Sequence, residues 1–300
     1  MSAHKPVSHT APAWIAIMPA LFVVLWSTGF VGAKYGLPYA EPFTFLLWRF
    51  VIVALLLLVA ALAVHAPWPA SRAEFGHIAV AGVLVHAVYL GGVFSAIHQG
   101  VSAGEVALIA GLQPVLTAAA AAPLLGERVS ARQWAGFVFG FLGVVLVVSN
   151  RFDPGGAGMI GYLSAFLALA GITAGTLYQK RFCSHMDLRS GAVIQFSASA
   201  VLMAVLAVLT ESMVVDWSGE FVFSLVWLVL VLSLGAISLL YLLIRHGEAA
   251  RVTSMFYLVP PVTALMAYVL FGERLGVVAF VGMGMVVVGV ALVVVRPRQA

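Results

Sequence analysis

Charged side chains are scarce in this chain of 300 residues, in which Asp, Glu, Lys and Arg together account for only 9%. Soluble domains carry roughly 25% of these residues, and a soluble protein of this size could not cover its surface with so few. Hydrophobic residues make up 63% of the chain. Apolar runs of about 20 residues, the length that spans a bilayer as a helix, recur throughout the sequence. The composition therefore predicts an all-α polytopic membrane protein.

Cysteine is nearly absent, which argues against two kinds of site. Cys183 is the single cysteine, so neither an internal disulfide nor a cysteine-based metal centre is expected. The sequence also has no metal-ligand spacing, and we expect no metal and no cofactor. The net charge of +4 reflects basic loops on one side of a membrane. It does not indicate binding to nucleic acid.

Ten membrane spans joined by short connections are predicted from the apolar runs. They are approximately 14–36, 43–65, 76–98, 102–125, 131–149, 159–180, 189–211, 219–243, 248–271 and 275–295. If the N-terminus is cytoplasmic, about eleven of the 15 Lys and Arg residues fall on the cytoplasmic side. Because cytoplasmic loops carry the excess of Lys and Arg, both termini are predicted to be cytoplasmic.

One sequence element occurs twice, half a chain apart. Leu-Gln-Pro-Val-Leu-Thr-Ala at 112–118 leads through an apolar run to Gly-Glu-Arg at 126–128. Leu-Val-Pro-Pro-Val-Thr-Ala at 258–264 leads in the same way to Gly-Glu-Arg at 272–274. Self-similarity at a fixed period predicts two copies of one structural unit.

The two copies contain five spans each, so they must cross the membrane in opposite directions. This inverted-topology arrangement is typical of many secondary transporters. We predict an N-terminal five-helix repeat over residues 1–149, a linker over 150–158 and a C-terminal five-helix repeat over 159–300. Because one chain already contains both halves, we expect a monomer to be sufficient for function.

The doubled Pro-then-Gly-Glu-Arg element resembles the drug/metabolite transporter superfamily, in particular its ten-helix EamA-type exporters. Trp26-Ser-Thr-Gly-Phe with Lys34 in the first span, and Arg49 in the second, match the same family. The resemblance covers about the whole chain, and the aromatic-rich spans are similar to those of YddG-type amino-acid exporters. It implies export of small metabolites across the bacterial inner membrane, and it implies a transporter rather than an enzyme. It also implies a central cavity lined mainly by the first, third, fourth, sixth, eighth and ninth spans.

The prolines of the doubled element are the first candidates for the transport site. Pro114 lies about halfway along the fourth span, and Pro260 and Pro261 lie about halfway along the ninth. A mid-helix proline frees the carbonyl four residues before it, and in a membrane such a break sits against protein or a wet cavity. We predict kinks at Pro114 and Pro260 that line the site and take part in gating; the alternative is a packing kink.

Polar and aromatic side chains at mid-depth are the remaining cavity candidates. They are Trp26, Ser27, His86, Tyr89, Gln113, Tyr241 and Tyr257. His86 and Tyr89 are three residues apart and share one helical face. Trp26 lies away from the interfacial belt where Trp usually sits. Gln113 either binds a zwitterionic solute or pairs with a neighbouring helix, and His86 either lines the cavity or bonds to another helix.

The basic residues of the spans and turns are interpreted separately, and only Arg49 has two open interpretations. Arg49 falls about a third of the way into the second span. It either snorkels outward or caps carbonyls, or it binds a substrate carboxylate. Lys34 is expected to snorkel, and the Glu273-Arg274 pair is expected to fix a helix corner rather than contact substrate.

Three further patterns predict local structure. Ser102 with Glu105, and Ser130 with Gln133, have the spacing of capping boxes that open a helix. The small residues of Gly136-x-x-x-Gly140 in the fifth span, with the glycines of the tenth, predict close packing between these two spans.

Carboxylates are missing from the middle of every predicted span. Proton-driven transporters usually place one there, and the related small multidrug pumps have a glutamate in the first span, where this chain has Trp26-Ser27-Thr28. We therefore predict facilitated, gradient-driven export, unless His86 supplies proton coupling.

The sequence favours an inner-membrane exporter of small metabolites, above all amino acids including aromatic and hydrophobic ones, that works by alternating access. Its expected partners are a small-molecule substrate and membrane lipids. A multidrug pump for organic cations stays open, because Trp26, Tyr89 and Tyr257 have the rings for a cation–π site. A nucleotide-sugar or sugar-phosphate antiporter is less favoured, because it would need several cations in the cavity and only Arg49 is available. An intramembrane enzyme would need paired Asp residues or a similar constellation, which the spans lack.

Overall fold

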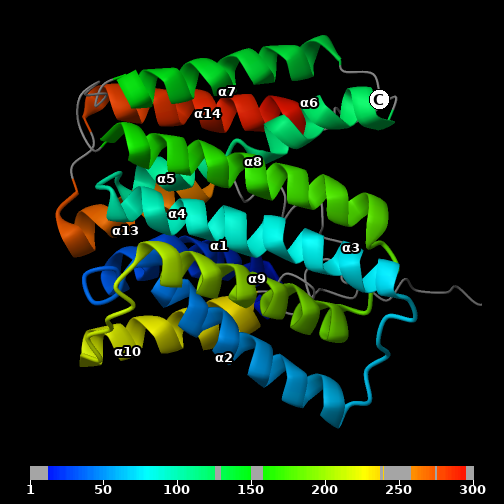
Figure 1. Ribbon diagram of the computed structural model, residues 1–300. Helices are drawn as coiled ribbons and strands as arrows, with labels where there is room; N and C mark the ends of the chain where they lie inside the picture. The colour runs from blue at the N-terminus through cyan, green and yellow to red at the C-terminus, as the bar shows by residue number, and fades with distance from the viewer. Residues whose placement is uncertain are drawn as a thin grey trace, which may run out of the picture.

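The computed structural model describes residues 13–125, 130–149, 158–236, 239, 258–273 and 276–294, and consists of helices packed side by side (Figure 1). The α-helices are α1 (Ala13–Gly36), α2 (Pro42–Ala63), α3 (Arg72–Gly82), α4 (Tyr89–His98), α5 (Ala103–Ala110), α6 (Gln113–Leu125), α7 (Ala131–Ser149), α8 (Gly158–Phe182), α9 (Leu188–Thr210), α10 (Gly219–Val226), α13 (Val259–Phe271) and α14 (Val277–Val294). Two π-helices, η1 (Val83–Val88) and η2 (Trp227–Ala236), continue α3 and α10 respectively.

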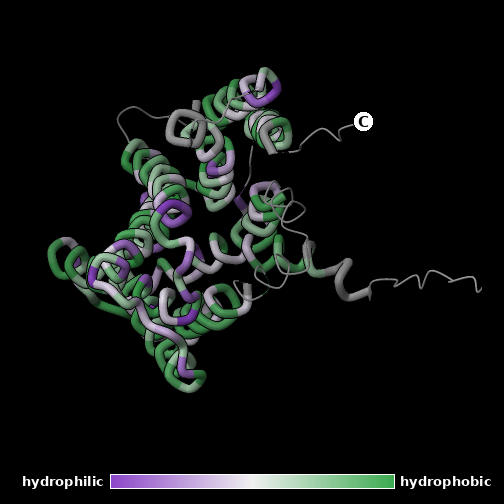
Figure 2. Tube along the Cα trace, turned by 90° about the vertical axis from the view of Figure 1, so that its right-hand side faces the viewer, coloured by the Kyte–Doolittle hydropathy of each residue, from purple (hydrophilic) through white to green (hydrophobic). Residues whose placement is uncertain are grey.

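Many of the helices have the apolar surface of membrane spans, and some also have the length. Within the described residues, four are long and apolar enough to cross a membrane: Pro42–Ala63, Arg72–His98, Gly158–Phe182 and Leu188–Thr210. Six shorter apolar helical segments lie within the other predicted spans. Hydrophobic positions run along nearly every helix (Figure 2). Large apolar side chains such as Val59, Leu209 and Val277 are 68%, 74% and 80% exposed, a surface that suits lipid acyl chains rather than water.

The structure contains the predicted inverted repeat. The starts of α2, α6 and α7 at residues 42, 113 and 131 recur at 188, 259 and 277 in α9, α13 and α14, each 146 residues later. The equivalent helices α2 and α9 pack against each other and run in opposite directions, since the last turn of α9 meets the first turn of α2 through Glu211. The fold is therefore the predicted all-α membrane fold of two inverted five-helix repeats.

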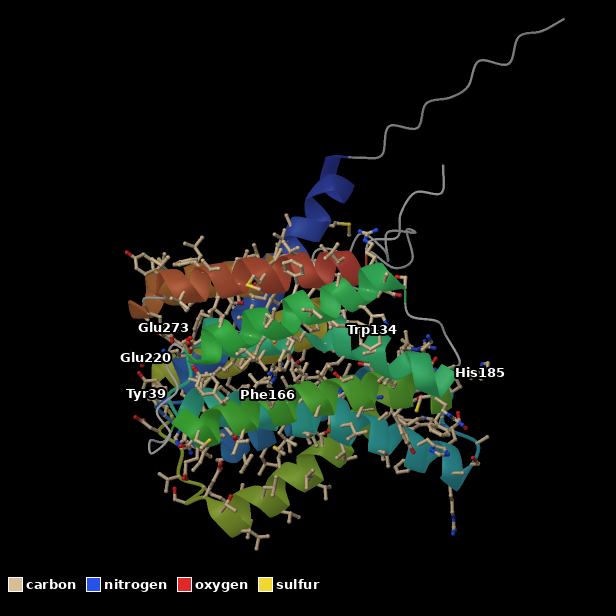
Figure 3. The ribbon with its side chains drawn as sticks, turned by 90° about the horizontal axis from the view of Figure 1, so that it is seen from above. Tyr39, Trp134, Phe166, His185, Glu220 and Glu273 are labelled. Atoms are coloured by element: carbon tan, nitrogen blue, oxygen red, sulfur yellow. The ribbon has the colours of Figure 1, made fainter. Side chains whose placement is uncertain are left out.

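The loops gather at two opposite ends of the bundle. Figure 3 shows Tyr39, Glu220 and Glu273 together at one end, which we call the Tyr39 end, and His185 at the other, the His185 end. At the Tyr39 end the loop after α1 is joined to the loop after α9. The Asp216 N–H donates to the Tyr39 carbonyl over 2.9 Å, and the Ser212 N–H donates to Glu41 over 2.7 Å.

The fourth span is interrupted rather than kinked, which corrects the expectation for Pro114. Helix α5 ends at Ala110 and α6 begins at Gln113, so Pro114 occupies the first turn of a new helix. Proline is tolerated there because the N–H groups of a first turn have no partner within the helix. Pro260 and Pro261 likewise lie in the first turn of α13. In each half, the prolines thus mark a helix start.

The two helix starts of the doubled element lie close together. Gly111, which ends α5, packs so tightly against the start of α13 that a Cβ at this position would stand 3.2 Å from Cγ of Pro260. Helix α13 ends at Gly272, whose φ of +67° places it in the left-handed region that favours glycine. The counterpart Gly-Glu-Arg turn at 126–128 and Arg274 lie outside the described residues.

The predicted capping and glycine contacts are present. Both capping boxes form, with the Glu105 N–H donating to Ser102 Oγ over 3.2 Å and the Gln133 N–H donating to Ser130 Oγ over 3.3 Å. Helices α7 and α14 pack along their glycines, because a Cβ added to Gly289 would lie 2.7 Å from the carbonyl oxygen of Gly136. This contact between the fifth and tenth spans forms one side of the bundle (Figure 1).

Candidate functional site

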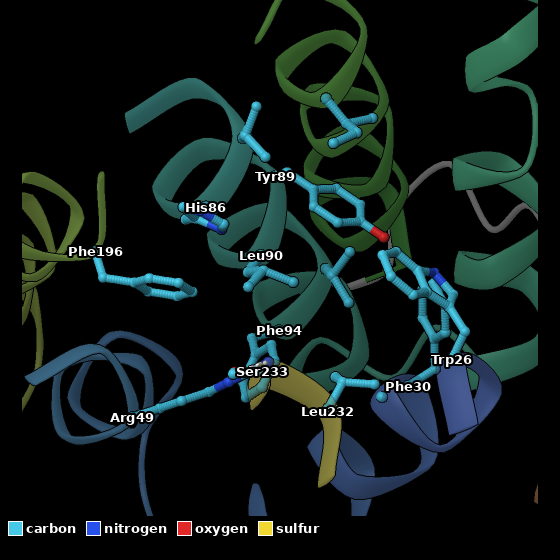
Figure 4. A pocket seen from close by; sticks show the side chains of 14 residues that line it. Trp26, Phe30, Arg49, His86, Tyr89, Leu90, Phe94, Phe196, Leu232 and Ser233 are labelled. Atoms are coloured by element: carbon cyan, nitrogen blue, oxygen red, sulfur yellow. Dashed lines mark hydrogen bonds between the residues drawn. The ribbon is translucent and has the colours of Figure 1, made fainter. Parts of the chain in front are cut away.

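A pocket with a cavity volume of about 110 Å³ lies between the two halves of the chain. Its walls are contributed by α1, α2, η1, α4, α8, α9 and η2, and most of them are apolar or aromatic (Figure 4). The lining residues are Trp26, Gly29, Phe30, Arg49, Val85, His86, Tyr89, Leu90, Val93, Phe94, Ile172, Phe196, Leu232 and Ser233.

The two π-helices form opposite parts of this wall. Val85 and His86 come from η1, while Leu232 and Ser233 come from η2. Position 232 is equivalent to position 86 under the 146-residue offset, so the same place in each repeat faces the pocket. A π-helix carries an extra residue per turn and is found frequently at functional sites. The paired irregular helices thus point to a site on the pseudo-symmetry axis.

Of the described residues that line the pocket, Arg49 is the one Lys or Arg. Its side chain is 3% exposed, and Nη2 donates to the Ser233 hydroxyl over 3.1 Å. The Ser233 hydroxyl donates in turn to the Leu228 carbonyl over 3.0 Å. A guanidinium in the middle of a membrane costs roughly 2.5–3.5 kcal/mol on insertion scales. The sequence allowed Arg49 to snorkel outward, and this is not observed. Its side chain instead points toward the pocket.

His86 is held between aromatic rings. Its imidazole stacks on Phe196 with centroids 4.2 Å apart and an interplanar angle of 17°. Phe196 also contacts Phe50 at 5.7 Å. Phe50 and Phe196 are equivalent positions in the two repeats, so one symmetric aromatic pair supports the histidine. The sequence reasoning did not single out Phe196, although the repeat offset pairs it with Phe50.

Trp26 and Tyr89 form another side of the pocket, and the Tyr89 hydroxyl points toward the Trp26 indole in Figure 4. Phe30 also lines the pocket. Gly29 allows η2 to approach α1 closely, because a Cβ there would stand 2.9 Å from a Leu232 methyl group.

Four other candidates lie outside the pocket wall. The buried Ser27 hydroxyl donates to the Val259 carbonyl over 3.3 Å, which joins α1 to the start of α13. Gln113 Nε2 donates to the Thr176 hydroxyl over 3.1 Å, so this amide pairs with the neighbouring helix α8. Pro114 and Pro260 lie at helix starts, as described above. The last two candidates, Tyr241 and Tyr257, lie outside the described residues.

The two ends of the bundle differ beside this pocket. At the Tyr39 end, Lys34 of α1 forms an ion pair with Glu273 after α13, and its ammonium lies 5.2 Å from the centroid of Phe271. Lys34 was expected to snorkel, but it instead joins two helices from different halves. Toward the His185 end a second hollow is lined by Thr176, Lys180 and Cys183, among others, and it shares Val85 with the pocket.

These features describe a helical membrane protein with a pocket between two inverted repeats. Comparison with known proteins agrees. The model of the EamA-like transporter family matches residues 13–149 and 159–295, and the chain belongs to this family.

Individual relatives are distant but cover nearly the full length. The chain is 27% identical to the uncharacterized transporter YvbV of Bacillus subtilis, over 93% of this chain and 90% of that one. It is 25% identical to a probable amino-acid metabolite efflux pump of Escherichia coli K12, over 91% of this chain and 92% of the pump. A protein solved by crystallography matches with a TM-score of 0.64 and 22% identity, over 96% of this chain and 99% of that one. At this identity the structure supports the fold alone.

Proposed function

We propose that this chain exports small metabolites, above all amino acids including aromatic and hydrophobic ones, by alternating access through the pocket around Trp26, His86 and Tyr89. One observation carries this proposal. The pocket lies where the two inverted halves meet, and its walls come from both of them. Secondary transporters with inverted repeats bind substrate near the midplane at the repeat interface. The relative described as a probable amino-acid metabolite efflux pump supports the substrate class.

The proposed direction of transport is outward, and the charges at the two ends of the bundle support the orientation in the membrane that goes with it. We propose that the protein lies in a bacterial inner membrane with both termini in the cytoplasm. The His185 end then faces the cytoplasm, because it carries basic residues such as Lys180 and Arg189. A solute would enter from that side, past the hollow beside Val85, and leave after the Tyr39 end has opened. A monomer divided into repeats at 1–149 and 159–300, with a linker at 150–158, is sufficient for this cycle.

The energy source we propose is the gradient of the solute itself. No Asp or Glu is found in the pocket lining within the part of the chain that the structure describes, and a carboxylate is the usual carrier of coupled protons in transporters. Efflux of organic cations, the alternative from the sequence, has less support because Arg49 would repel a cation from the same space.

Counterflow in proteoliposomes tests the proposal. Vesicles loaded with unlabelled L-phenylalanine should accumulate labelled L-phenylalanine without any imposed pH gradient. A sugar phosphate and tetraphenylphosphonium serve as competing solutes, and both should compete poorly. Saturable counterflow of the organic cation alone would contradict the proposed substrate class. Transport that strictly requires a pH gradient would contradict the proposed energy source.

A further inference from the structure

We propose that Arg49 and Ser233 form a carboxylate-binding subsite, which makes the pocket selective for anionic and zwitterionic solutes over cationic ones. The proposal rests on the pocket being the transport site. It adds the charge of the group that is recognised and the residues that recognise it.

The first observation is the state of the guanidinium itself. Arg49 makes one side-chain hydrogen bond within the described residues, from Nη2 to Ser233. Nε is buried without a hydrogen-bond partner. An arginine carries five N–H donors in a planar fork, so most of its donor capacity is uncommitted. Buried charged groups are normally paired, and an uncommitted guanidinium that lines a pocket is suited to a partner from outside the protein.

The second observation is the chemistry around it. Among the described residues that line the pocket there is no Asp or Glu, so Arg49 has no counter-ion from this part of the chain. The other polar groups of the lining are the imidazole of His86, the hydroxyls of Tyr89 and Ser233, and the indole N–H of Trp26. Arg–carboxylate pairs are often bidentate, with two parallel N–H···O bonds. A carboxylate is therefore the group that this end of the pocket best accommodates.

The third observation is how Arg49 is positioned. Its hydrogen bond runs from α2 in the first half to η2 in the second half, at the place where Ser233 also donates to Leu228 five residues earlier. The π-helix thus orients the serine oxygen toward the guanidinium. Figure 4 shows Arg49 and Ser233 meeting on one side of the pocket, with Trp26 and Tyr89 on another. A solute with its carboxylate at Arg49 would extend its apolar part toward the aromatic rings.

Three probes that share one phenyl scaffold test this subsite: 3-phenylpropionate, L-phenylalanine and phenethylamine. They carry an anionic, a zwitterionic and a cationic end respectively. Binding is measured on the purified protein in detergent, as the concentration that gives half-maximal thermal stabilisation. We expect 3-phenylpropionate and L-phenylalanine to bind at least about tenfold more tightly than phenethylamine, since hydrogen bonds to charged groups contribute that much or more.

Variants assign the preference to Arg49. Arg49→Met should remove the difference between 3-phenylpropionate and phenethylamine, while Arg49→Lys should keep part of it. Arg189→Met, which removes an exposed cation at the start of α9, is the matched control and should leave the difference unchanged. If Arg49→Met does not fold, the comparison of the three probes on the wild-type protein still decides whether the pocket prefers a carboxylate.

Two results overturn the subsite: phenethylamine binding as tightly as 3-phenylpropionate, or no binding of 3-phenylpropionate to the wild-type protein. An unchanged preference in a folded Arg49→Met variant overturns it as well. Binding in detergent is independent of transport. Absence of L-phenylalanine counterflow with the probe preference intact would therefore refute the export proposal and leave the subsite standing.

Discussion

Thr44 at the start of α2 donates two hydrogen bonds to the carboxylate of Glu211 at the end of α9. Its backbone N–H and its hydroxyl lie 2.7 Å and 2.8 Å from Oε2. The Phe43 N–H donates to the other carboxylate oxygen over 2.7 Å. A first helical turn has N–H groups that no helix carbonyl can accept. Here Glu211, a residue of the second repeat, accepts hydrogen bonds from two of these N–H groups in the first repeat. The contact holds the antiparallel helices α2 and α9 together at the Tyr39 end.

Removing this contact should destabilise the fold. Glu211→Ala leaves the N–H groups of Phe43 and Thr44 without their acceptor, and we expect a loss of about 1–3 kcal/mol in unfolding free energy. A lower apparent melting temperature in detergent measures it. Glu220→Ala, an exposed carboxylate at the same end, is the control and should have a smaller effect. Equal effects of the two substitutions would refute the role given to Glu211.

The neighbouring Glu41 predicts a dependence of stability on pH. Hydrogen bonds from the Ser212 hydroxyl and N–H hold the pKa of Glu41 below its ordinary value. A carboxyl group whose pKa is lowered in the folded state stabilises the fold above the unfolded pKa, about 4.3. This contribution is lost as the pH falls through the lower folded pKa. Ser212→Ala should therefore lower the melting temperature at pH 7 and have progressively less effect as the pH falls through this range. A constant difference across the range contradicts this explanation.

The packing of α7 on α14 predicts opposite effects for two glycines of the same helix. A methyl group at Gly289 would lie 2.6 Å from the Gly140 nitrogen, whereas one at Gly284 would meet nothing within 4 Å. We expect Gly289→Ala to cost about 1–3 kcal/mol of stability because the helices must separate. Gly284→Ala should be neutral or slightly stabilising, since alanine favours a helix. Thermal unfolding in detergent compares them, and a destabilised Gly284→Ala with a stable Gly289→Ala would contradict the packing described.

The interruption at Pro114 predicts an effect on transport rather than on folding. Pro114→Ala restores an N–H and so favours a helix that continues from α5 into α6. We expect slower counterflow, by about tenfold, with little change in melting temperature; the rate change corresponds to about 1.4 kcal/mol in the barrier. Pro42→Ala, in the first turn of α2, is the matched control. Unchanged transport in Pro114→Ala would contradict a role in transport for the interruption between α5 and α6, and would leave it a role in packing alone.

Much of the fold could be predicted from the sequence because membrane spans impose simple rules. Span length follows from bilayer thickness, and the doubled element gave the repeat and hence its inversion. The sequence could not distinguish an interrupted helix from a kinked one at Pro114, because proline is compatible with both. The assignment of residues 150–158 as the linker lies almost entirely outside the described residues and stays a prediction.

The site was predicted less completely, for a physical reason. Trp26, His86 and Tyr89 line the pocket, but their role in binding stays a prediction. Ser27 and Gln113 are also polar residues at mid-span, yet their side chains form hydrogen bonds to neighbouring helices and do not line the pocket. Whether the side chains of Arg49, Phe196 and Ser233 face the pocket depends on how their helices are rotated about the helix axis. For Ser233, the π-helix η2 shifts that rotation by an extra residue per turn, which a regular helical period does not predict.

Alternate opening of this pocket to the two sides of the membrane can be tested at Lys34 and Glu273. These residues join α1 to the end of α13 at the Tyr39 end, so this contact must separate for a solute to leave. In a Cys183→Ser background, which removes the single cysteine, Lys34→Cys with Glu273→Cys can be linked by a short bis-methanethiosulfonate reagent. We expect that linkage stops L-phenylalanine counterflow, that reduction restores it, and that either single-cysteine variant is unaffected by the reagent. Undiminished counterflow in the fully linked protein would rule out opening of the pocket at the Tyr39 end.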